Sequence, residues 1–111
     1  MRRLLAVLCM ALPAQAAQPA DAYPSRPIRW VIPYVAGGSN DIMGRIVAQR
    51  LADRIGQQVV IDNRAGGGGV VAAELVARSA PDGYTIMLAN AGPNAINPGL
   101  RSRLPYKPDD F

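Results

Sequence analysis

The 111-residue sequence contains no histidine and a single cysteine, Cys9. Nucleophilic catalysis needs a base positioned beside the nucleophile, and tight transition-metal sites draw chiefly on histidine and cysteine. The sequence offers neither a nucleophile–base pair nor a cluster of metal ligands. We therefore expect no enzyme activity, no metal site and no cofactor. With one cysteine the chain can form no internal disulfide.

The sequence also lacks a clustered basic face. Twelve Lys and Arg stand against eight Asp and Glu, which gives a net charge of +4. Two of the positive charges, Arg2 and Arg3, lie at the extreme N-terminus, and without them the balance is ten to eight, or +2. The remaining arginines are scattered singly, whereas proteins that bind nucleic acid gather them on one face. We expect no nucleic-acid partner.

Long hydrophobic runs are absent as well. The apolar run from Leu4 to Leu12 is too short to span a bilayer. It follows a basic pair and precedes Ala14-Gln15-Ala16, a small-x-small cleavage pattern, and this combination is typical of a secretory signal. We expect residues 1–16 to be a signal peptide cut after Ala16, and the product to be exported. Residues 17–27, which hold three prolines, are expected to form a flexible lead-in.

The rest of the sequence predicts alternating strands and helices. Three apolar runs rich in strand formers alternate with two stretches of helical spacing, in the order 28–33, 40–55, 59–62, 70–78 and 84–89. The apolar runs are typical of buried parallel strands. Right-handed crossovers would then give an α/β fold, a parallel β-α-β-α-β sheet with helices on both faces. Beyond it we expect a helical turn at 97–100, capped by Asn97, and an extended segment at 104–111.

The turn between the first strand and the first helix is the most informative stretch. Gly37 and Gly38 allow a positive φ and a close approach of the backbone to a guest, and Ser39 and Asn40 are good N-cap candidates. The N–H groups of a helix start, with the positive end of its dipole, form a seat for an anion. The helix should present one apolar face, made of Ile42, Met43, Ile46, Val47, Leu51 and Ile55.

Other motifs have simpler structural interpretations. The Gly66–Gly69 run resembles the start of a dinucleotide fingerprint, but Val71 occupies the position of its third glycine. Trp30 lies in mid-strand and is interpreted as core, while Tyr34 fits a pocket wall and the core equally well. Three carboxylates have no histidine partner and are interpreted as structural, namely Asp41, Asp62 and Asp82.

Five short motifs occur in order along the chain: Tyr23–Ile28, Pro33–Asp41, Val60–Gly66, Ala80–Thr85 and Ala95–Pro98. Together they make the sequence resemble the Bug family, the extracytoplasmic solute receptors of tripartite tricarboxylate transporters. The resemblance implies that residues 28–111 are the N-terminal segment of lobe 1 of a type II periplasmic binding protein, whose second lobe is absent. It also implies a receptor that does no chemistry, captures small carboxylates and delivers them to membrane permease subunits.

The same resemblance implies a binding mode, in which backbone N–H groups of loops at strand ends grip the ligand. Carried onto this chain, the implied ligand-binding residues are Tyr34, Ala36, Gly37, Gly38, Ser39, Asn40, Asp41, Gly66, Gly67, Gly68, Asn90, Ala91, Gly92 and Asn94. The chain departs from the family pattern at Gly67, Ala72 and Asn94, where the family often has alanine, glycine and histidine.

Two alternatives stay open, a truncated remnant that binds nothing and a fragment of a Rossmann-like enzyme. In either case so short a chain leaves sheet edges unpaired, so we expect marginal stability and self-association.

Overall fold

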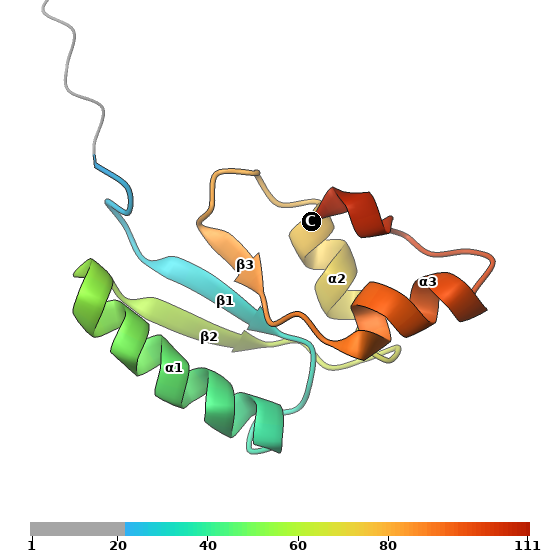
Figure 1. Cartoon of the computed structure of the whole chain (residues 1–111), viewed down its shortest axis with the longest axis horizontal. Coiled ribbons are helices and arrows are strands. Elements are labelled where there is room, and N and C mark those ends of the chain that lie inside the picture. Colours follow the sequence, from blue (N-terminus) through green and yellow to red (C-terminus); the bar gives the residue numbers. More distant parts are fainter. Residues whose placement is uncertain (1–21) are drawn as a thin grey trace, which may run out of the picture.

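The computed structural model describes residues 22–111 (Figure 1). Its elements are β1 (Ile28–Ile32), α1 (Ser39–Ile55), β2 (Val59–Asn63), α2 (Val70–Ala77), β3 (Thr85–Met87), the π-helical turn η1 (Gly92–Ile96), α3 (Asn97–Leu100) and the 3₁₀ turn η2 (Pro108–Asp110). The predicted order of strands and helices is confirmed. The expected signal peptide and its cleavage site lie outside the described residues.

The three strands form one parallel sheet in the order β2-β1-β3. β1 pairs with β2 along its whole length, from Ile28 opposite Val59 to Ile32 opposite Asn63, and with β3 over Arg29–Val31. The chain leaves β1 in one direction to reach β2 and crosses back over β1 to reach β3. Right-handed crossovers therefore place α1 and α2 on opposite faces of the sheet (Figure 1), which confirms the predicted α/β fold.

The core is centred on β1, the middle strand. Val31 and Ile32 have no exposed surface, and Pro33 directly after the strand is also fully buried. The helices contribute mainly alanine to the buried set, which comprises Ala48 on α1 and Ala72 and Ala73 on α2. Small residues at these positions let the helices lie close to the sheet.

α1 contacts the sheet through its small residues, and most of its predicted apolar face points to solvent instead, with only Leu51 and Ile55 half-buried. The buried positions of α1 are Asp41, Gly44 and Ala48, and a Cβ built on Gly44 would lie 2.5 Å from Cδ1 of Ile32. Such close approach favours glycine, because any larger residue would have to displace the buried Ile32 side chain. The larger side chains of α1 lie away from this contact. The exposed fractions are 54% for Ile42, 60% for Met43, 55% for Ile46 and 45% for Val47.

β2 is an edge strand, so the prediction of a buried second strand is wrong. Within the described residues one side of β2 has no neighbouring strand, and Val60 is 48% exposed. β3 is also shorter than the predicted 84–89. The ladder ends where the N–H of Leu88 donates to the carbonyl of Val31 at 2.9 Å.

The segment after β3 is more helical than predicted. The helical turn at 97–100 is confirmed as α3, but its N-cap is Ile96, because the side chain of Asn97 donates to Gly68 instead. The stretch expected to be extended, 104–111, contains η2. Tyr106 is buried, and its hydroxyl donates to the carbonyl of Pro93, which fastens this stretch to η1.

The described part of the lead-in packs against the turn at 82–84, which does not fit a flexible segment. The N–H of Ser25 donates to the hydroxyl of Tyr84 at 2.8 Å, and Arg26 pairs with Asp82 at 2.9 Å. The Arg26 guanidinium also lies 4.1 Å from the centre of the Tyr84 ring. Aromatic, ionic and hydrogen-bonding contacts together order residues 22–27, which their proline content alone does not reveal.

Candidate functional site

The first loop joins β1 to α1 at the carboxyl edge of the sheet. Gly37 has a φ of +84°, which favours glycine, whereas Gly38 has φ −76° and ψ 169°, an extended conformation open to any residue. Gly38 is the N-cap of α1, and no side chain caps the helix, so the predicted cap at Ser39 or Asn40 is wrong. The first N–H groups of α1 lack partners within the helix.

Asp41 holds this loop from the first turn of α1. Its side chain is buried, and its Oδ2 accepts from the N–H of Gly37 at 2.8 Å and from Nε of Arg45 at 3.0 Å. The hydrogen bond from Arg45, and next that from Gly37, lower the pKa of Asp41 from 3.8 to about 2. The carboxylate of Asp41 and the N–H of Gly37 are therefore engaged within the protein.

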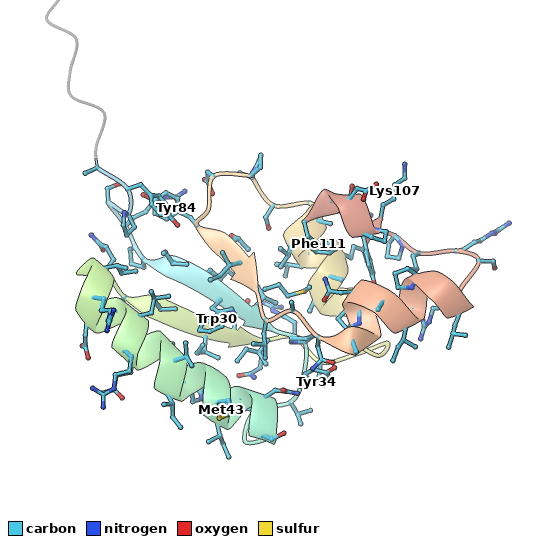
Figure 2. The ribbon with its side chains drawn as sticks, in the orientation of Figure 1. Trp30, Tyr34, Met43, Tyr84, Lys107 and Phe111 are labelled. Carbon is cyan, nitrogen blue, oxygen red and sulfur yellow. The ribbon has the colours of Figure 1, made fainter. Side chains whose placement is uncertain are left out.

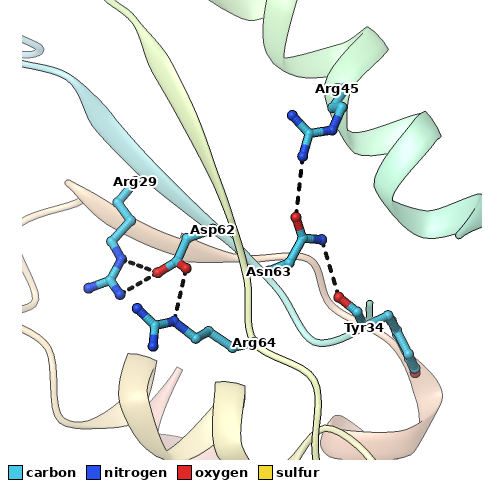
Figure 3. Close-up of polar contacts among 6 residues, drawn as sticks. All are labelled: Arg29, Tyr34, Arg45, Asp62, Asn63 and Arg64. Atoms are coloured by element: carbon cyan, nitrogen blue, oxygen red, sulfur yellow. Dashed lines mark hydrogen bonds and ion pairs between the residues drawn. The ribbon is translucent and has the colours of Figure 1, made fainter. Parts of the chain in front are cut away.

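Asn63, the last residue of β2, ties the first loop to the sheet edge (Figure 3). Its Nδ2 donates to Oδ1 of Asp41 at 3.0 Å and to the carbonyl of Tyr34 at 3.2 Å. Its Oδ1 accepts from Nη2 of Arg45 at 3.3 Å. Sequence reasoning missed Asn63 as a site residue. Its place directly at the end of a parallel strand, beside another strand-end loop, is the signal that could have found it.

The second loop, Gly66–Gly69, runs through four consecutive residues of positive φ, between 59° and 137°. This conformation requires glycine and explains the run without any nucleotide. The carbonyl of Gly68 accepts from Nδ2 of the buried Asn97 at 2.9 Å, and that of Gly67 accepts from Arg101 at 3.2 Å. Side chains of α3 and of the residue that follows it thus hold the loop by its carbonyl groups.

The third loop, Asn90–Asn94, is largely helical and holds itself together. The N–H of Asn90 donates to Oδ1 of Asn94 at 3.1 Å, and the N–H of Gly92 donates to Oδ1 of Asn90 at 3.4 Å. Asn94 also lines an apolar hollow of about 440 Å³ between α2 and β3. Its side chain therefore lies toward that hollow, with its oxygen engaged by the loop.

The three loops meet at Gly92. A Cβ built there would lie 3.3 Å from the carbonyl oxygen of Gly68 and 3.6 Å from the hydroxyl of Tyr34. A Cβ on Gly69 would lie 3.1 Å from Pro93, so the second and third loops are packed against each other. Tyr34 is half-buried at the end of β1, beside η1 (Figure 2). The structure thus brings the three predicted loops together, whereas Ala36 and Ala91 are exposed members of them.

A second polar cluster lies on the opposite face of the sheet from α1. The carboxylate of Asp62 accepts from Nε and Nη2 of Arg29 and, at 2.9 Å, from Nε of Arg64 (Figure 3). Burial raises the pKa of Asp62, but the hydrogen bonds from Arg29 and Arg64 outweigh it and lower the pKa overall. Asp62 is thereby satisfied within the protein. On the α1 face, Trp30 is half-buried, and its indole N–H is buried without an acceptor in the described residues.

Residues 22–111 contain no group of three or more Cys, Asp or Glu placed to hold a metal ion. In the same part of the chain, no helix is both long enough and apolar enough to cross a membrane.

A family model described as "Tripartite tricarboxylate transporter family receptor" matches residues 43–111. The chain belongs to this receptor family. Protein BugT of Bordetella pertussis is 46% identical over 111 residues, which cover 96% of this chain and 34% of BugT. A protein encoded between tcbD and tcbE in Pseudomonas sp. strain P51 is 43% identical over 113 residues, covering 99% of this chain and 33% of that protein. The chain thus spans about a third of the length of these curated relatives.

Several solved structures agree with the fold. A periplasmic transporter superposes with a TM-score of 0.76 at 45% identity, covering 78% of this chain and 29% of that one. MatC of Rhodopseudomonas palustris, solved with bound malate, gives 0.75 at 37% identity, with 80% and 31% covered. Another R. palustris protein, solved with adipate, gives 0.74 at 38% identity, with 78% and 29% covered. The resemblance to the Bug family is confirmed.

Proposed function

We propose that this chain forms part of the carboxylate-binding lobe of a periplasmic solute receptor. Backbone N–H groups at the start of α1, with those N–H groups of the second and third loops that make no hydrogen bond inside their own loop, would hold one carboxylate of a small organic acid. The malate and adipate bound by two structural relatives support a dicarboxylate ligand. The family is one of receptors, which supports binding without chemistry.

The observation that carries the proposal is the meeting of three strand-end loops around Gly92, at the edge of the sheet where α1 also begins. Open α/β sheets bind ligands at this carboxyl edge, and a helix N-terminus offers N–H donors and a positive dipole end to an anion. The carbonyl groups of Gly67 and Gly68 are already taken by Arg101 and Asn97, which leaves donors rather than acceptors on the second loop.

The proposal includes the route of the protein and its partner. We propose export with cleavage after Ala16, residence in the periplasm and delivery of the ligand to the membrane permease subunits of a tripartite transporter. The rest of the binding site would come from the segments that the longer relatives have and this chain does not include.

The test compares Gly38→Val with Ser39→Ala. The chain is joined to the C-terminal two thirds of BugT, and calorimetry measures the affinity for malate and for adipate. The extended φ of Gly38 admits valine, so the reason for the effect is the side chain in the anion seat, not a forbidden backbone conformation. Losing one charge-assisted hydrogen bond, worth about 1.5–3 kcal/mol, lowers affinity about tenfold or more.

Ser39→Ala is the matched control, because it removes a hydroxyl and keeps the N–H. Its affinity should stay within about threefold of the parent, since surface substitutions of this kind change free energies by about 0.5 kcal/mol. Loss of binding in Ser39→Ala with parental binding in Gly38→Val would show that the backbone seat is wrong. A joined receptor that folds but binds neither acid would refute the proposed function.

A further inference from the structure

Three polar side chains from two elements form a closed network beside the proposed seat. Asp41 and Arg45 lie on α1, and Asn63 ends β2. Their hydrogen bonds measure 3.0 Å between Asp41 and Arg45, 3.0 Å between Asn63 and Asp41, and 3.3 Å between Arg45 and Asn63. Each of the three therefore contacts the other two.

The network also holds the first loop at two points of its backbone. At the start of the loop, Nδ2 of Asn63 donates to the carbonyl of Tyr34 at 3.2 Å. Further along the loop, the N–H of Gly37 donates to the carboxylate of Asp41 at 2.8 Å. The loop is thus fixed through one backbone carbonyl and one backbone N–H, by side chains of the helix and the strand beside it.

Charge in the network is balanced, which matters beside a seat for an anion. Asp41 is the acidic group and Arg45 the basic group of the network, and their ion pair spans 3.0 Å. An unpaired carboxylate in the first turn of α1 would repel a ligand carboxylate, whereas the paired one repels it less. The uncharged amide of Asn63 adds two donors without adding charge.

We infer that Asn63 is a positioning residue, which sets the first loop in the conformation that binds a carboxylate. The part of this inference that concerns a carboxylate ligand rests on the proposed function. The part that concerns the loop rests on the hydrogen bonds of Asn63 alone. Asn63 does not touch the ligand; it acts through the carbonyl of Tyr34 and the carboxylate of Asp41. Its removal should loosen the loop and weaken binding while the sheet remains intact.

The first experiment needs no ligand. Amide hydrogen exchange, followed by NMR in the 111-residue chain, reports on the N–H of Gly37. In N63A this exchange should accelerate about tenfold, because the loop loses one of its two attachments. The amides of the central strand should exchange as in the parent. Q49A, an exposed position on α1, is the control and should leave Gly37 unchanged.

The second experiment joins the same variants to the C-terminal two thirds of BugT and measures their affinity for malate by calorimetry, at constant ionic strength. Affinity should fall about tenfold in N63A and stay parental in Q49A. N63D keeps the shape of the side chain but sets a carboxylate about 3 Å from that of Asp41, whose charge raises the pKa of the new group. At pH 7 both carboxylates are ionised and repel each other, so we expect weak binding by N63D. Near pH 5 the new carboxyl takes up a proton, donates to Asp41 again and lets binding recover toward the parental value, which a merely structural role does not produce.

The outcomes separate the inference from the proposed function. Parental Gly37 exchange in N63A overturns the inference, and so does accelerated exchange with unchanged malate affinity. Affinity of N63D that follows the parent at every pH also overturns it. If the parent joined to the C-terminal two thirds of BugT binds no malate, the proposed function is refuted, and Gly37 exchange in N63A of the 111-residue chain still decides whether Asn63 positions the loop.

Discussion

At the scale of single residues, the two glycines of the first loop differ in what the fold requires of them. Gly37 needs its positive φ, and its N–H is bound by Asp41. Gly38 needs no special conformation, and a Cβ there would lie 3.5 Å from the carbonyl oxygen of Val35, so neither the backbone nor the packing of the protein itself requires glycine. Asp41, which the family resemblance implied as a ligand contact, uses its carboxylate to hold the loop through the N–H of Gly37. Because the carboxylate of Asp41 holds the loop, protonation of this carboxylate at low pH should weaken the attachment of the loop.

The stability contributed by Asp41 depends on pH. Its pKa is about 2 in the folded protein, below the usual 3.8, so the folded state favours the ionised form. The contribution is complete above pH 4 and disappears as the pH falls through about 2. We expect D41N to be less stable than the parent above pH 4, by an amount that shrinks steadily on acidification. Urea unfolding from pH 7 to pH 2 measures this difference.

D53N is the matched control, because Asp53 is an exposed carboxylate on the same helix. Its difference from the parent should be small at every pH. A D41N penalty that does not change between pH 5 and pH 2 would contradict the assignment.

At the scale of elements, α1 and β1 come together through glycine. Ile32 has no exposed surface, and the Cβ position of Gly44 would lie 2.5 Å from its Cδ1. Glycine normally weakens a helix interior by about 1 kcal/mol relative to alanine. At this position the close helix–sheet contact outweighs that cost.

We predict that Gly44→Leu destabilises the fold by about 1–3 kcal/mol, because the larger side chain must displace a fully buried one. Thermal and urea unfolding measure the change. Arg50→Leu, at an exposed position of the same helix, should change the free energy of unfolding by no more than about 0.5 kcal/mol. Equal effects of the two leucines would mean that α1 does not lie against Ile32 as described.

At the scale of the whole molecule, the described residues leave both outer strands of the sheet unpaired on one side. Val60 on β2 is 48% exposed, and Met43 on α1 is 60% exposed (Figure 2). Unpaired strand edges with apolar side chains are templates for association. The expected self-association stays a prediction. The two candidate surfaces for it are the edge of β2 at Val60 and the exposed face of α1 at Met43.

We predict that Val60→Lys reduces self-association more than Met43→Lys. A lysine on an edge strand opposes pairing through the backbone, whereas one on the helix removes only apolar surface. Sedimentation velocity over a range of concentrations compares the two variants with the parent. A larger effect of Met43→Lys would place the association on the helix face instead of the strand edge.

The amino-acid sequence alone determined the order of the elements, because apolar periodicity and turn residues are local properties. It also located the first and second loops, since glycine marks positions of positive φ such as Gly37 and Gly66. The family followed from five motifs in order, which no single element carries. The absence of histidine, a matter of composition alone, argued against most catalytic and metal chemistry.

Only the tertiary structure decided which surfaces are covered and which polar groups meet. Ile42 and Ile46 do lie on one face of α1, as their spacing predicts, but this face is exposed. The residues that contact the sheet are Gly44 and Ala48, because small residues allow close packing. The strand order made β2 an edge, which no local pattern encodes. Asn63 lies 22 residues from Asp41 in sequence, and only the parallel pairing of β1 and β2 brings the two side chains to one edge, where they form a hydrogen bond.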